Sequence, residues 1–63
     1  MRFYILPDAP QFDPADQEWF YTQDEAYDAA YNWSEELNGI PVKVGTFNLG
    51  GPSYTVAVVT ATV

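Results

Sequence analysis

Residues 22–39 constrain the fold most, because they carry signals for both ends of one helix. Thr22 and Glu25 match the T-x-x-E capping box, in which the threonine hydroxyl accepts the amide of the third helical residue and the glutamate bonds the capping amide. At the other end, Asn38 and Gly39 are residue types that stop helices, since they tolerate the left-handed conformation. We therefore expect a helix that begins after Thr22 and ends at Asn38.

One side of this helix is apolar. At 100° per residue, Ala29 lies at the border of a narrow stripe of four side chains, which are Ala26, Ala30, Trp33 and Leu37. The alanines are small enough to let a sheet approach closely. We expect this stripe to pack on a β-sheet.

Three other stretches have strand patterns. Residues 2–6 form a short apolar run that Pro7 ends. Residues 42–48 alternate in the manner of a strand, and residues 54–63 are rich in β-branched side chains and uncharged on both faces. Because a strand that is apolar on both faces usually lies centrally, we expect residues 54–63 between the other two strands.

These elements predict an α+β fold, with one β-α-β-β domain over the 63 residues. The three-stranded sheet has the order 2–6, 54–63, 42–48; its last two strands in sequence form a hairpin, and the helix covers one face through a right-handed crossover. Residues 7–21 hold three prolines and predict a loop, whose closing aromatic triplet offers a short edge strand before the helix.

A single helix covers only one face of a sheet, so the other face needs a second cover. A contiguous exposed apolar patch on a small domain usually marks an interface. Two covers remain open, the loop of residues 7–21 or a second copy of the chain. In the second case, we expect self-association through four residues assigned to the uncovered face, which are Phe47, Ala57, Val59 and Ala61.

Charge is divided unevenly along the chain. The net charge is −7, and all nine carboxylates lie between Asp8 and Glu36, where there is no Lys or Arg. The two cations, Arg2 and Lys43, lie outside that stretch. This pattern disfavours direct binding of nucleic acid or anionic lipid, both of which need cationic contacts, and favours a basic protein partner.

The sequence has few residues that could support catalysis or bind a metal ion. With no His and no Cys, a nucleophile such as Ser34 or Ser53 has no conventional base, so we expect no enzyme and no cofactor. Asp13, Asp16 and Glu18 offer oxygen ligands, but their D-x-x-D-x-E spacing does not match a calcium loop, and we expect no metal site. The absence of cysteine and of any long apolar segment predicts a cytoplasmic protein without a membrane segment.

The outward side of the predicted helix is the candidate partner-binding surface. Asp24, Asp28 and Glu35 align on it, beside Tyr27 and Tyr31. Carboxylates pair with Arg and Lys, and tyrosine rings stack on guanidinium groups. A solvated face is the simpler interpretation, but like charges at Asp24 and Asp28 cost stability and no cation interrupts them.

We therefore predict a small acidic inhibitor or adaptor that docks this helix side on a basic, nucleic-acid-binding protein surface as a mimic of nucleic acid. In size and charge, such a chain resembles the small acidic proteins of phages and mobile elements, including anti-restriction and anti-CRISPR factors. The resemblance covers no motif and identifies no family. The alternative is a structural or assembly protein that self-associates through the uncovered sheet face.

Overall fold

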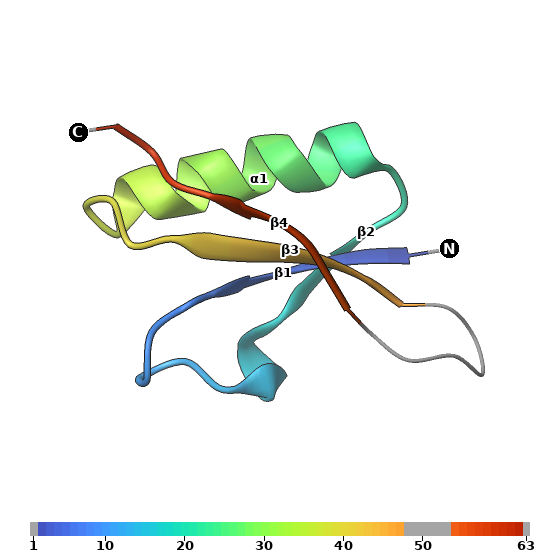
Figure 1. Ribbon diagram of the computed structural model, residues 1–63, viewed down its shortest axis with the longest axis horizontal. Helices are drawn as coiled ribbons and strands as arrows, with labels where there is room; N and C mark the ends of the chain where they lie inside the picture. Colours follow the sequence, from blue (N-terminus) through green and yellow to red (C-terminus); the bar gives the residue numbers. More distant parts are fainter. Residues whose placement is uncertain (1, 48–53, 63) are drawn as a thin grey trace.

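The computed structural model describes residues 2–47 and 54–62 of the 63-residue chain. These residues form a four-stranded antiparallel sheet and one α-helix (Figure 1). The elements in chain order are β1 (Arg2–Pro7), the 3₁₀ helix η1 (Pro14–Asp16), β2 (Glu18–Phe20), α1 (Gln23–Glu36), β3 (Val42–Phe47) and β4 (Tyr54–Val59). The predicted α+β class is therefore confirmed.

The order of the sheet is β2-β1-β3-β4, and every neighbouring pair is antiparallel. The prediction that residues 54–63 form the central strand is wrong, because β3 pairs with both β1 and β4 and leaves β4 at the edge. The predicted pairing of the last two strands is confirmed. Residues 48–53, which include the expected turn, lie outside the described residues, as does residue 63.

The short strand β2 explains the difference in topology. A helix that crosses the sheet directly from the end of β1 would bring the next strand in parallel to β1. Instead, β2 first returns the chain antiparallel to β1, and α1 then crosses the sheet, so that β3 enters antiparallel to β1. The three residues of β2 are the edge strand that the aromatic triplet suggested, shifted by one residue.

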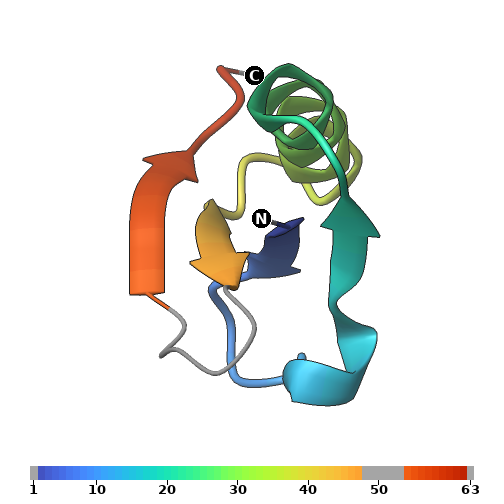
Figure 2. The same ribbon diagram turned by 90° about the vertical axis from the view of Figure 1, so that its right-hand side faces the viewer.

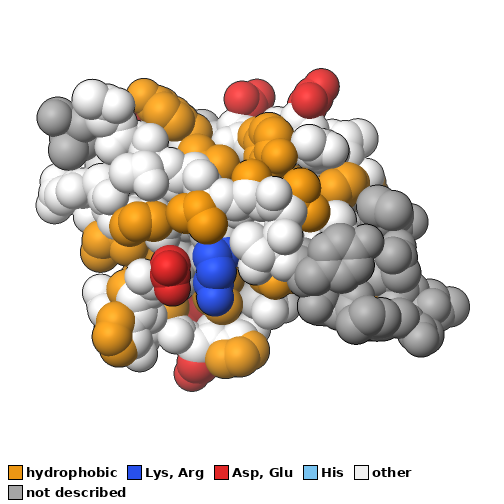
Figure 3. Space-filling view, in the orientation of Figure 1, with side chains coloured by type: hydrophobic (Ala, Val, Ile, Leu, Met, Phe, Trp, Pro, Cys, Tyr) orange, Lys and Arg blue, Asp and Glu red, His pale blue; other side chains and the backbone are white. Residues whose placement is uncertain are grey.

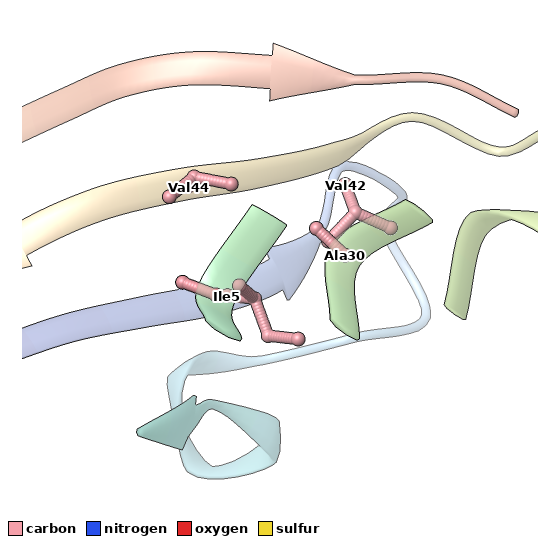
Figure 4. Close-up of a cluster of buried hydrophobic side chains, with 5 residues drawn as sticks. Ile5, Ala30, Val42 and Val44 are labelled. Carbon is pink, nitrogen blue, oxygen red and sulfur yellow. The ribbon is translucent and has the colours of Figure 1, made fainter. Parts of the chain in front are cut away.

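The core lies between α1 and one face of the sheet, as predicted (Figure 2). Ala26 and Ala30 are fully buried on α1 and face the strands. Their small side chains let the helix pack closely on three branched residues of the two central strands, namely Ile5, Val42 and Val44 (Figure 4). Trp33 is half-buried and packs at the rim of this cluster.

Thr22 caps the N-terminus of α1. Its hydroxyl oxygen accepts the amide of Glu25 at 3.2 Å, which is the first half of the expected capping box. The same hydroxyl donates to the Glu25 carboxylate at 2.8 Å. The glutamate therefore bonds the threonine side chain and not the capping amide that the motif predicts.

The C-terminus of α1 lies at Glu36, two residues before the predicted end. Asn38 and Gly39 both adopt left-handed backbone conformations, with φ of 59° and 92°. The amide of Gly39 donates to the carbonyl of Ser34 at 2.8 Å, and the amide of Asn38 donates to that of Glu35 at 3.1 Å. This is the Schellman arrangement, and it satisfies carbonyls that a helix end leaves free.

Ser34 occupies a core position that the apolar stripe did not predict. It is fully buried, and its Oγ accepts a hydrogen bond from the amide of Ala61 at 2.9 Å. This bond ties the segment after β4 to the helix. The hydroxyl that was considered above as a nucleophile thus has a structural partner.

We expect Ser34→Ala to lower the free energy of unfolding by about 1–3 kcal/mol, because the buried amide of Ala61 loses its acceptor. Urea denaturation measures this change. Asn32→Ala, at an exposed position of the same helix, controls for the higher helix propensity of alanine. Equal stability of Ser34→Ala and the parent chain would contradict the assigned role.

Candidate binding surfaces

The outer side of α1 is the surface that the sequence singled out. Asp24, Asp28 and Glu35 are exposed there, on the side opposite the buried alanines. Tyr31 is also exposed, at 44%, whereas Tyr27 is half-buried and packs against the core. We call Asp24, Asp28, Tyr31 and Glu35 the acidic face of α1. Tyr27 borders it, and its ring is partly committed to packing.

Every charge on α1 is negative. The helix carries five carboxylates and no cation, and acidic side chains project at the top of Figure 3, where α1 lies. Glu35 and Glu36 lie in the last turn, where free carbonyls leave a partial negative charge. Carboxylates at this end disfavour the helix by roughly 0.3–1 kcal/mol each. Folding therefore gains nothing from their charge.

The sheet face away from α1, which we call the open face, is aromatic. Tyr4 and Trp19 pair across β1 and β2, and their ring centroids lie 5.8 Å apart. Trp19 meets Phe47 edge to face, also at 5.8 Å. Trp19 is 44% exposed and Phe47 37%. These three rings form a continuous aromatic platform on the open face.

Gly45 makes room for the platform. It lies directly opposite Tyr4 in the pairing of β1 with β3. A Cβ at Gly45 would lie closer to the outer ring atoms of Tyr4 than van der Waals contact allows, so the ring lies over the bare backbone of β3. Alternation along residues 42–48 indicates a strand but does not reveal this close approach.

A shallow pocket of about 120 Å³ opens beside the platform. Its lining consists of Arg2, Trp19, Phe20 and Tyr21. The Arg2 guanidinium lies 5.9 Å from the centre of the Tyr21 ring, within the range of a cation–π contact. Both of these side chains are exposed. The pocket thus combines one cationic group with three aromatic walls.

The four residues predicted for self-association are divided between the two sheet faces. Phe47 lies on the open face. The assignment of the other three to that face is wrong. Val59 pairs with Val42, which is buried under the helix, so the side of β4 that carries Val59 faces the helix. Val59 packs against the core, Ala61 is buried, and Ala57 shares the helix side by alternation with Val59.

Two other valines of β4 occupy the open face. Val58 lies opposite Lys43 and is 54% exposed, and Val56 is 43% exposed. A register shift between Val44 and Gly45 leaves Val56 without a direct partner on β3. Sequence alternation could not choose which side of β4 faces the helix, since both sides are uncharged.

Residues 8–17 lie on the side of the sheet away from α1 (Figures 1 and 2). The Asp13 and Asp16 carboxylates accept backbone amides at 2.9 Å and cap the 3₁₀ helix η1. Phe12 contacts the Trp33 ring edge to face, with centroids 6.0 Å apart. Across residues 2–47 and 54–62, no group of three His, Cys, Asp or Glu side chains is placed to hold a metal ion.

Comparison with known proteins does not assign the chain. No protein-family model matches it, and neither the curated proteins nor the solved structures include a match. In the part of the chain that the structure describes, no helix is long and apolar enough to cross a membrane.

We expect Gly45→Ala to destabilise the protein by about 1–3 kcal/mol, because the new methyl group displaces the Tyr4 ring. In a Tyr4→Ala background the same substitution becomes neutral or stabilising, since alanine is less flexible than glycine in a strand. A double-mutant cycle by urea denaturation measures the coupling. The same cost in both backgrounds would show that the Tyr4 ring is not the obstacle.

Proposed function

We propose that the chain is a small non-enzymatic binding protein, an inhibitor or adaptor, that docks the acidic face of α1 on a basic protein surface. The observation that carries this proposal is the charge of α1, which has five carboxylates and no cation. Three of these carboxylates align on the exposed side, opposite the buried alanines. A rigid helix presents them without the entropy cost of ordering a loop.

The spacing of these carboxylates supports a nucleic-acid-binding partner. At 1.5 Å of rise per residue, Asp24 and Asp28 lie about 6 Å apart along the helix axis, and Asp28 and Glu35 about 10 Å apart. Successive phosphates of one DNA strand rise 3.4 Å along the duplex axis, so these separations match the axial rise of roughly two and three phosphates. A basic groove that binds phosphates could therefore accept the acidic face as a mimic.

Tyr31 adds contact area between the charged positions. Its ring is 44% exposed and lies beside the line of carboxylates. Tyrosine is favoured at interfaces because it supplies a large contact with few rotatable bonds, and it stacks on guanidinium groups. The acidic face therefore combines charge pairing with an aromatic contact. This combination suits the inhibitor of phage or mobile-element type that the sequence suggested.

We expect Asp28→Lys to weaken partner binding at least tenfold, because a cation then faces a basic surface. The chain is immobilised, proteins are captured from its native host at low salt, and the affinity of each recovered partner is measured at rising salt. Asp8→Lys makes the same change of charge at an exposed loop position and should retain binding. Salt-independent affinity, or full binding by Asp28→Lys, would count against the proposal.

Self-association is a second candidate function, favoured by the state of β4. This edge strand, YTVAVV, carries no charge and no proline, and it exposes Val56 and Val58. Edge strands usually carry such blocking residues, because their free backbone groups pair with other strands. The β4 edges of two copies could pair and extend the sheet, which would suit an assembly protein.

For this second candidate we expect Val58→Lys to convert a self-associated species into a monomer, measured by sedimentation at high protein concentration. Thr60→Lys, at an exposed residue beyond the strand, is the matched control. Added salt should strengthen self-association by screening the net charge of −7, which is opposite to its effect on the acidic face. A parent chain that stays monomeric removes this candidate.

A further inference from the structure

The two edges of the described sheet differ in how easily another strand can pair with them. The edge strand β2 has only three residues and begins with the charged Glu18. The other edge strand, β4, has six residues and carries neither a charge nor a proline. Short length and charge are features that keep edge strands from pairing. The edge open to a further strand is therefore that of β4 (Figure 2).

We propose that β4 pairs with β4 of a second copy, and that the dimer binds a two-fold symmetric basic protein through both acidic faces at once. Such a dimer rests on the function proposed above, and it combines its two candidates in one assembly. Pairing of β4 with β2 of the next copy would build an open filament, whereas pairing of β4 with β4 closes at two copies. The short, charged β2 disfavours the filament.

The residues around β4 suit the approach of a second copy. Val56 and Val58 are exposed by 43% and 54%, and β-branched side chains on paired strands stabilise a sheet through mutual contact. The register shift between Val44 and Gly45 lies in the first half of β4, so its regular part extends from Ala57 to Val59.

Charge does not oppose pairing at this edge. None of the nine carboxylates belongs to β3 or β4, the two strands nearest to the contact, and Lys43 is the only charged residue in them. The net charge of −7 is therefore carried by other elements of the chain. The strands that meet do not place like carboxylates opposite each other.

The direction of pairing determines where the two helices lie. Two antiparallel edge strands are related by a two-fold axis perpendicular to the sheet, so both copies of α1 lie on the same side of one eight-stranded sheet. Because α1 packs on β1 and β3, four strand spacings separate the helices, roughly 19 Å along the sheet. This separation exceeds the screening length of about 8 Å at physiological ionic strength, so the two acidic faces repel each other only weakly.

A dimer of this kind fits a partner with the same symmetry. Many DNA-binding proteins are two-fold symmetric dimers, in which each subunit contacts one half-site. Once one acidic face is bound, binding of the second becomes intramolecular, which raises the apparent affinity by roughly 100-fold or more without a new kind of contact. A partner with a single basic surface gains no such advantage.

Hydrogen exchange of the parent chain tests the pairing. Amides of β4 that point away from β3 bond water in a monomer and the second copy in the dimer. We expect some amides of residues 54–59 to exchange at least tenfold more slowly at high protein concentration than at low concentration, because they gain partners. Amides of β2 are the internal control and should not change. Exchange of β4 that does not depend on concentration, or equal slowing in β2, would overturn the proposal.

Variants test the use of both acidic faces. Val58→Lys adds a charge at the exposed pairing edge and leaves the acidic face intact, so the dimer should dissociate. The probe is the protein recovered from the native host on the immobilised parent chain. We expect this protein to bind Val58→Lys at least tenfold more weakly than the parent chain. Thr62→Lys makes the same charge change at an exposed residue beyond β4 and should bind as the parent does.

The outcomes separate this inference from the function on which it rests. Binding that Asp28→Lys weakens but Val58→Lys does not would leave the acidic face as a binding site and overturn docking by a dimer. Binding that neither variant weakens would overturn both. Weaker binding of both variants, with Thr62→Lys unaffected, is the result that we expect.

Discussion

The structure depends on one constraint, which is that a single helix has to supply a core for a four-stranded sheet. The solution is close packing of Ala26 and Ala30 on the two central strands, where Ile5, Val42 and Val44 are almost fully buried. Most of the buried apolar surface thereby lies on one side of the sheet, and Leu6 is the buried side chain of β1 on the other side. On the open face the cover is residues 8–17, and the side chains that they leave exposed, such as Trp19 and Phe47, have to be stable in contact with water or with a partner.

The charges are not divided between the two sides of the sheet in the same way. Carboxylates occupy α1, β2 at Glu18 and the segment between β1 and β2, and that segment lies on the same side of the sheet as the two cations. At physiological ionic strength the screening length is about 8 Å, which is less than the 15 Å of the shortest dimension of the molecule. The carboxylates of α1 are therefore largely screened from the open face. The carboxylates nearer to the open face are those of residues 8–17.

Local signals in the sequence predicted the local structure well. The cap at Thr22, the left-handed stop at Gly39 and the buried alanines all depend on neighbouring residues, and each is present. The order of the strands depends on long-range pairing, and the three-residue strand β2 was enough to reverse the direction of β3. Uncharged strands such as β4 carry no polarity that marks their buried side, so the assignment of Val59 to the uncovered face was wrong.

The candidate sites differed in the same way. Asp24, Asp28 and Glu35 could be predicted as exposed, because they share one helix and its period fixes their direction. The aromatic platform joins Tyr4, Trp19 and Phe47 from three strands. No spacing in the sequence connects these residues. The sequence also does not reveal that Gly45 lacks a side chain so that the Tyr4 ring can lie over it.

The exposure of the platform has a cost in folding stability. A chain of about 60 residues buries only about 60% of its unfolded surface, so it has little apolar area to spare. Leaving Trp19, Phe47, Val56 and Val58 partly exposed gives up hydrophobic stabilisation of about 25 cal/mol for each Å² left in water. These residues are not scattered, since all four lie on one face. Gly45 has a low strand propensity, but its missing side chain leaves room for the Tyr4 ring among them. Gly45 thereby serves the packing of the Tyr4 ring, whereas the grouped exposure of the four other side chains is the kind of apolar patch that usually marks an interface.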